Sequence, residues 1–225
     1  MNAGEVIAKA RPRVEEGGIE QQAAQQQQDR LLGPAHDQLI HHVAGLMIAA
    51  QGVILSESLQ ACHIPVRVSE FCSVRGYTVL RILKAFEEKK SDDVFRYFAT
   101  GWNRDGLVMR EMNELLRSHS GSADRHLLIL LTDAEPNDSF RIQSSEQFPF
   151  GKDYGDEAAV NDTAAEVRAL QRKGICVSAV FMGTDAGALK AEIIYGKEYT
   201  RIQEVGQLAR AAGLLIQKEI SKIDL

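Results

Sequence analysis

Three acidic side chains follow the most apolar run of the sequence. Asp133 comes directly after "HLLILLT" (residues 126–132), and Glu135 and Asp138 follow within the next five positions. Hard divalent cations prefer carboxylate oxygens as ligands, and an acid cluster that holds a metal can support hydrolysis. Asp133 could equally cap a helix or bind loop amides. Its position alone leaves metal binding, metal-assisted chemistry and a structural turn open.

A second polar site lies upstream, in "ATGWNRDG" (99–106). Asn103 offers a neutral amide oxygen, and Asp105 stands where the next helix is predicted to start. Either residue could simply cap that helix. In a doubly wound α/β fold, however, this loop can lie on the same rim as Asp133, where ligands gather at the carboxyl ends of the strands.

The sequence contains no phosphate-binding loop, no dinucleotide-binding fingerprint and no nucleophile elbow. The three cysteines have no metal-ligand spacing and are predicted to be reduced core thiols of a cytosolic protein. The net charge of −5 argues against nucleic-acid binding, which normally requires a basic surplus. No run approaches the ~20 apolar residues that span a bilayer, so we expect no membrane insertion.

Apolar periodicity and turn residues predict helices that alternate with buried strands. The continuous apolar runs 126–132 and 175–183 are typical of strands covered on both faces. The runs 64–71 and 77–86 are joined by a short link, which favours an antiparallel pair. We therefore predict an α/β fold with a doubly wound, mostly parallel sheet, helices on both faces and one antiparallel edge strand. One or two helices are expected across 36–62, and single helices at 91–98, 104–121, 156–174, 185–196 and 204–223. A last strand is expected at 199–202 and a polar loop at 139–156.

The first 45 residues differ in composition from the rest of the sequence. They contain "QQAAQQQQ" (21–28), which predicts a loose helix or disorder, and "EVIAK" is their nearest strand candidate. We therefore divide the chain into an atypical segment, 1–45, and a folded domain, 46–225.

Taken together, "RHLLILLTDAEPND", "GWNRDG" and "HIPVRVSEFCSVRGYTVLRILKAF" resemble a von Willebrand factor A (VWA) domain over residues 48–222. The most similar branch holds the bacterial nitric-oxide-reductase activation proteins and the cobalt-chelatase VWA subunit. The resemblance implies a metal-ion-dependent adhesion site with Asp133 in its third loop and Asn103 where threonine is common. Trp102, Asp105, Glu135, Asn137 and Asp138 would form a partner-binding rim.

The Asp-x-Ser-x-Ser motif of the family's first loop is absent from the sequence. Because Mg²⁺ or Mn²⁺ would then keep few protein ligands, we expect this ion to bind weakly or not at all. The central first strand, which should precede the motif, is also not evident. The N-terminal segment could supply a substitute, the sheet could close without one, or the reading frame could have an altered N-terminus.

The resemblance implies a non-enzymatic, cytoplasmic interaction module. It would act as an adaptor for a MoxR-type AAA+ ATPase in metal insertion or complex maturation. The alternative is a metal-dependent hydrolase or phosphotransferase that uses Asp133, Glu135 and Asp138.

Overall fold

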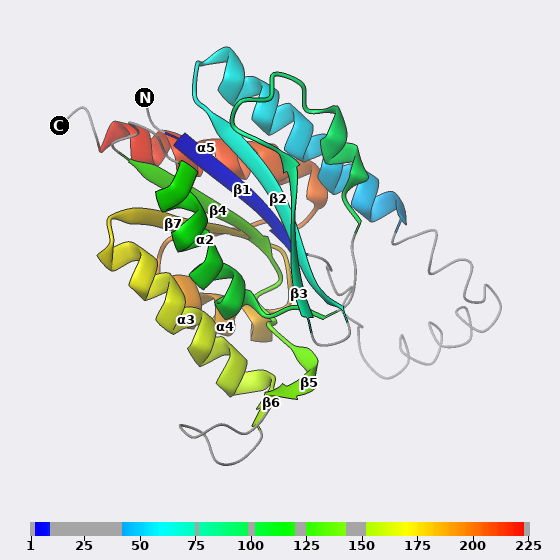
Figure 1. Ribbon diagram of the computed structural model, residues 1–225, viewed down its shortest axis with the longest axis vertical. Helices are drawn as coiled ribbons and strands as arrows, with labels where there is room; N and C mark the ends of the chain where they lie inside the picture. Colours follow the sequence, from blue (N-terminus) through cyan, green and yellow to red (C-terminus); the bar gives the residue numbers. More distant parts are fainter. Residues whose placement is uncertain are drawn as a thin grey trace.

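The fold is built on a six-stranded sheet with the order β3-β2-β1-β4-β7-β8 (Figure 1). The computed structural model describes residues 3–9, 42–74, 77–98, 102–119, 125–142 and 152–222. The strands are β1 (Ala3–Lys9), β2 (Val66–Val74), β3 (Tyr77–Lys84), β4 (His126–Thr132), β7 (Ile175–Phe181) and β8 (Tyr199–Arg201). Neighbouring strands are parallel except β2 and β3, which form the predicted antiparallel edge pair.

The central strand comes from the N-terminal segment. β1 lies between β2 and β4, and Val6 is paired with Val68 on one side and Ile129 on the other. Of the three explanations for the missing strand, the substitute strand is therefore confirmed. The boundary predicted at residue 46 leaves β1 in the atypical segment, although β1 pairs within the sheet of the folded domain. It also cuts the following helix, which the structure describes from His42 to Ala61. Most of the remaining N-terminal segment, including its glutamine tract, lies outside the described residues.

Helices cover both faces of the sheet (Figure 1). One core cluster joins the helix His42–Ala61, the 3₁₀ turn η1 (Asp92–Arg96) and α5 (Leu208–Ser221) to one face. The other cluster joins α2 (Asp105–His119), α3 (Asp156–Arg172) and α4 (Asp185–Tyr195) to the opposite face. A short 3₁₀ turn, η2 (Val205–Gln207), precedes α5. This two-sided coverage explains why β4 and β7 are continuously apolar.

The helix His42–Ala61 is long and apolar enough to cross a membrane by length and composition. In the structure, Ile48, Leu55 and Leu59 on one of its faces are buried in the core. That burial is also what a core helix of a folded domain shows.

The region predicted as a polar loop contains a small hairpin instead. β5 (Asp138–Ile142) and β6 (Lys152–Tyr154) pair antiparallel in a separate two-stranded sheet. The prediction failed because the strands are short: β6 has three residues, and the apolar alternation of β5 is limited to Phe140 and Ile142.

Candidate functional site

Asp133 directly follows β4, at the edge where the parallel strands β1, β4 and β7 have their carboxyl ends; we call this edge the rim. The half-buried carboxylate accepts a hydrogen bond from the Glu135 amide at 3.0 Å. The amide of Ala134 donates to the Thr132 hydroxyl at 2.8 Å, and Ala134 has a φ of +55°. Asp133 therefore does shape the turn, in the manner of an Asx-turn, and this does not exclude a second role for its other oxygen.

The loop that contains Asn103 lies on the same rim. The backbones of Asn103 and Asn137 exchange two hydrogen bonds, of 2.8 and 3.0 Å, and form an isolated antiparallel bridge. On the other side, the Ser73 amide near the end of β2 donates to the Trp102 carbonyl at 2.7 Å. The structure thus brings together the two loops that the sequence singled out.

Two side chains of this loop are buried. Asn103 is 4% exposed, and its Oδ1 has no hydrogen-bond partner among the described residues. Asp105, the first residue of α2, is fully buried. An amide oxygen without a partner in the interior is costly. Asn103 is therefore a position at the rim that would gain from an added hydrogen-bond donor or cation.

Tyr195 lies near two acids of the rim, Asp105 and Asp133, and was not predicted. Burial, together with the negative charges of Asp105 and Asp133, raises the pKa of Tyr195 well above its usual value. Its hydroxyl lies close to Thr132 but makes no well-formed hydrogen bond to a described residue. In the sequence, Tyr195 appears only as an apolar position near the end of a predicted helix, so no signal there points to the rim.

The other two acids have cationic partners. Arg104 Nε donates to Asp138 Oδ2 at 2.6 Å, and Lys190 Nζ lies 3.5 Å from Glu135 Oε1. These ion pairs weaken both carboxylates as metal ligands. Of the residues expected to form a partner-binding rim, Asp105 and Asp138 are buried, whereas Trp102 and Asn137 are exposed.

The described residues supply only part of a metal site. Asp133, Asn103 and Asp105 carry oxygen atoms suited to a hard cation. No group of three His, Cys, Asp or Glu residues in the described part of the chain could hold a metal ion. Directly after β1, where the resemblance implies Asp-x-Ser-x-Ser, the sequence reads "ARPRV" (10–14). This oxygen set does not complete the near-octahedral shell that Mg²⁺ requires.

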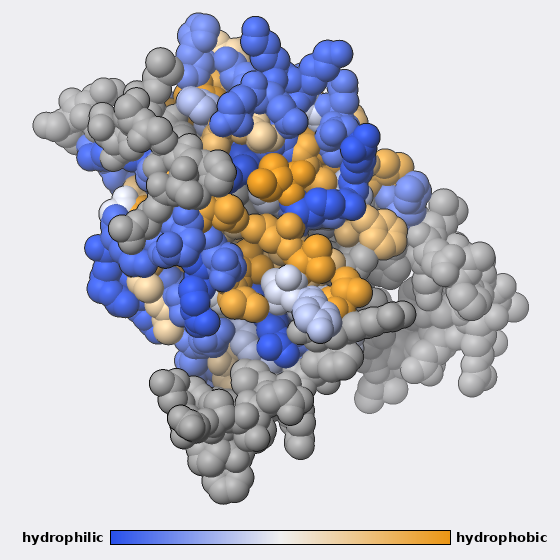
Figure 2. Space-filling view, viewed as in Figure 1, coloured by the Kyte–Doolittle hydropathy of each residue, from blue (hydrophilic) through white to orange (hydrophobic). Residues whose placement is uncertain are grey.

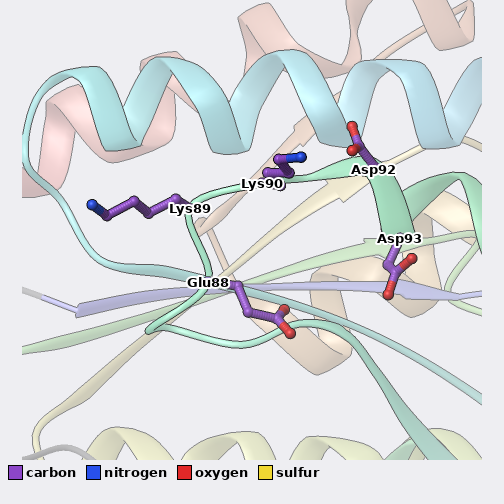
Figure 3. Close-up of a pocket in the computed structure, with 5 residues that line it drawn as sticks. All are labelled: Glu88, Lys89, Lys90, Asp92 and Asp93. Carbon is purple, nitrogen blue, oxygen red and sulfur yellow. The ribbon is translucent and has the colours of Figure 1, made fainter.

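A hollow of about 340 Å³ lies elsewhere, lined by Glu88, Lys89, Lys90, Asp92 and Asp93. Figure 3 shows that these side chains point in different directions. The hollow follows β3, which runs antiparallel to the other strands and so ends at the edge opposite the rim. Without convergent groups, it does not form a site for chemistry.

No protein-family model and no curated protein matches the sequence. Several solved structures are similar in fold. Manganese-loaded TRAP of Plasmodium vivax has a TM-score of 0.57 at 13% identity over 96% of this chain and 73% of its own. The vWF domain of the pilus-tip protein Mfa5 of Porphyromonas gingivalis has a TM-score of 0.57 at 8% identity over 98% and 95%.

Proximal thread matrix protein 1 from the mussel byssus, also solved with zinc in its MIDAS motif, has a TM-score of 0.54 at 13% identity. This chain spans about half, 47%, of that protein's length. At these identities the similarity establishes the fold alone. The chain has the α/β fold of von Willebrand factor A domains, as its sequence motifs predict.

Proposed function

We propose that this chain is a non-enzymatic protein-interaction module that binds its partner at the rim. The observation that carries the proposal is the pairing of Asn103 with Asn137, which joins two polar loops at the carboxyl edge of a VWA-type sheet. The exposed side chains of Trp102 and Asn137 stand beside this bridge. Tryptophan is among the residues that contribute most to binding at protein interfaces.

The partner that the VWA resemblance implies is a MoxR-type AAA+ ATPase in the cytoplasm. In this proposal the ATPase supplies the energy for metal insertion or complex maturation, and the chain contacts the target. The proposal is tested by measuring the affinity of the full chain for each purified MoxR-type ATPase of the same genome. Trp102→Ala is expected to lower that affinity at least tenfold, and Leu214→Ala, an exposed position on α5, serves as the matched control.

Absence of binding to every such ATPase would refute the adaptor role. Equal affinity of the Trp102 and Leu214 variants would instead refute the rim as the contact surface.

The metal contribution is proposed to be weak. TRAP is manganese-loaded and the byssus protein holds zinc in its MIDAS motif, but the sequence after β1 lacks the first-loop ligands here. Calorimetric titration with Mg²⁺ and Mn²⁺ is expected to give no affinity tighter than the millimolar range. Micromolar binding that Asp133→Ala abolishes would contradict this expectation. Turnover of simple phosphoesters with added metal, lost in the same variant, would favour the hydrolase alternative.

A further inference from the structure

β3 forms one edge of the six-stranded sheet, and β2 is its neighbour on the inner side. Among the described residues, no backbone hydrogen bond joins Tyr77–Lys84 to any segment other than β2. An edge strand of eight residues presents a row of N–H and C=O groups that a further strand can pair with.

The usual protections of an edge are weak along this strand. Proteins shield edges with prolines, bulges and outward-pointing lysines. The strand contains no proline, and its one irregularity lies opposite Val68 and Ser69, so Tyr77–Arg81 are regularly paired.

Both cations of β3 have hydrogen-bond or ion-pair partners within the same chain. Lys84 is fully buried, and its ammonium group donates to the carbonyls of Val66, Ala85 and Glu88 at 3.2, 3.1 and 2.7 Å. Arg81 forms an ion pair with Glu70 at 2.5 Å and donates to the Arg96 carbonyl. Both cations are therefore held by contacts within the chain, and neither serves to protect the edge against pairing with a further strand.

Apart from Arg81, the exposed side chains of β3 are apolar, and they lie on both faces of the strand. Tyr77 and Val79, two positions apart on one face, are 77% and 44% exposed. Ile82, on the opposite face beside the half-buried Leu80, is 47% exposed. Figure 2 shows apolar side chains gathered on that second side, over the middle of the molecule where Figure 1 places the central strands beside α2. A half-solvated antiparallel edge would normally alternate apolar and polar residues.

We infer that β3 pairs antiparallel with β3 of a second copy of this chain, so that the two sheets become continuous. The incoming strand must be extended, apolar on both faces and nearly free of uncompensated charge, and β3 itself meets each condition. A two-fold axis makes such an edge complementary to itself. The inference is independent of the proposed function.

Charge restricts the register of this pair. A two-fold axis perpendicular to the sheet keeps every side chain on its own face and makes one residue of β3 face its own copy. Arg81 is excluded as that residue, because like charges directly opposite each other are destabilising. With Val79 at the axis, Arg81 faces Tyr77 and can stack on its ring; with Leu80 at the axis, Arg81 faces Val79. Because the paired strands are antiparallel, the two rims point in opposite directions, and one dimer could bridge two partners.

Sedimentation equilibrium of the full chain tests the inference. The wild type is expected to form a reversible dimer in the micromolar range. The double variant Val79→Lys/Ile82→Lys, which places charges on both faces of the edge, is expected to be monomeric. The double variant Leu189→Lys/Leu214→Lys, at two exposed leucines of α4 and α5, should stay dimeric. A monomeric wild type, or a dimer that survives the edge substitutions, would overturn the inference.

A cysteine scan keeps the test informative if the lysine variant folds poorly. Cys62, Cys72 and Cys176 are first replaced by serine, and single cysteines are then placed at 78, 79, 80 and 81. Disulfide-linked dimers are expected to form fastest at 79 or 80 and to fall off on both sides, because only the residue at the axis faces its own copy. Equal rates at all four positions, or no crosslinking at any, would contradict the β3 pair.

Discussion

At the scale of single residues, the rim is defined by buried polar atoms more than by exposed acids. One carboxylate oxygen of Asp133 accepts the hydrogen bond that forms the turn, and Asp138 and Glu135 are paired with cations. Asn103 has an amide oxygen without a hydrogen-bond partner in the described part of the chain, and Asp105 is fully buried. Two of the acids at this edge, Asp138 and Glu135, are therefore compensated by cations of the chain itself, which is consistent with a contact surface that does not depend on a bridging cation.

Gly106 fixes the approach of α2 to α3. A Cβ at this position would lie 2.1 Å from Asp162 Oδ2 and 3.2 Å from the Asp162 carbonyl carbon. The Tyr154 hydroxyl ties the same junction, since it accepts from the Gly106 amide and donates to Asp162. Gly106→Ala is expected to lower the free energy of unfolding by about 1–3 kcal/mol through overpacking, measured by urea denaturation.

Gly213 in α5 is the matched control, because a Cβ there would meet nothing within 4 Å. Gly213→Ala should leave the free energy of unfolding unchanged or raise it by up to about 1 kcal/mol, since alanine favours a helix. Equal effects of the two substitutions would show that α2 and α3 are not in close contact at Gly106.

Cys176 is expected to be less reactive than Cys62, another free cysteine of the chain. Burial, together with the neighbouring Glu219, raises the pKa of Cys176 to about 11. Only roughly one Cys176 in a thousand is then a thiolate at pH 8, and the thiolate is the reactive form. Cys62, predicted as a core thiol, is in fact exposed. Alkylation followed by mass spectrometry should label Cys62 far faster in the folded protein and both residues alike in urea; equal labelling of the folded protein would contradict the burial of Cys176.

At the scale of elements, the helix His42–Ala61 ends in a Schellman motif without glycine. Ile64 N–H donates to the Leu59 carbonyl and His63 N–H to the Gln60 carbonyl, both at 2.9 Å. His63 has a φ of +58°, a conformation in which glycine avoids the steric penalty of a Cβ. His63→Gly is expected to raise the free energy of unfolding by up to about 1 kcal/mol. His63→Ala, which keeps a Cβ, should give no such gain in the same urea titration.

The elements that the sequence predicts are those whose burial leaves a pattern. β4 and β7 are apolar runs because both their faces are covered, and the short link after Val74 reveals the antiparallel pair. β1 was only the nearest strand candidate of its segment, because its seven residues include only two large apolar side chains, Val6 and Ile7. The rim was predictable because Asp133 and Asn103 flank such elements. Tyr195 was not, because tertiary packing alone brings its hydroxyl to the rim.

At the scale of the whole molecule, the chain begins with its central strand. β1 pairs over six residues with β2 and over six with β4. Residues separated by more than a hundred positions meet there. Among the described strands of the sheet, the hydrogen-bonded ladder joins β3 and β2 to β4, β7 and β8 only through this short strand. The order of the sheet therefore implies that β1 determines whether the domain folds as one unit.

Ile7→Pro tests that dependence. Ile7 lies opposite Ser69 of β2 on one side and Leu130 of β4 on the other. Its N–H therefore donates a hydrogen bond to one of these two strands, and proline removes that donor. A loss on the order of 3 kcal/mol or more is expected, which is a large part of the roughly 5–15 kcal/mol that stabilises a domain. Circular dichroism and the fluorescence of the single tryptophan should then report one shared transition at lower urea. Ile7→Val keeps the N–H and should cost only about 0.5–1.5 kcal/mol; an unchanged urea midpoint for the proline variant would show that residues 3–9 are not the centre of the sheet.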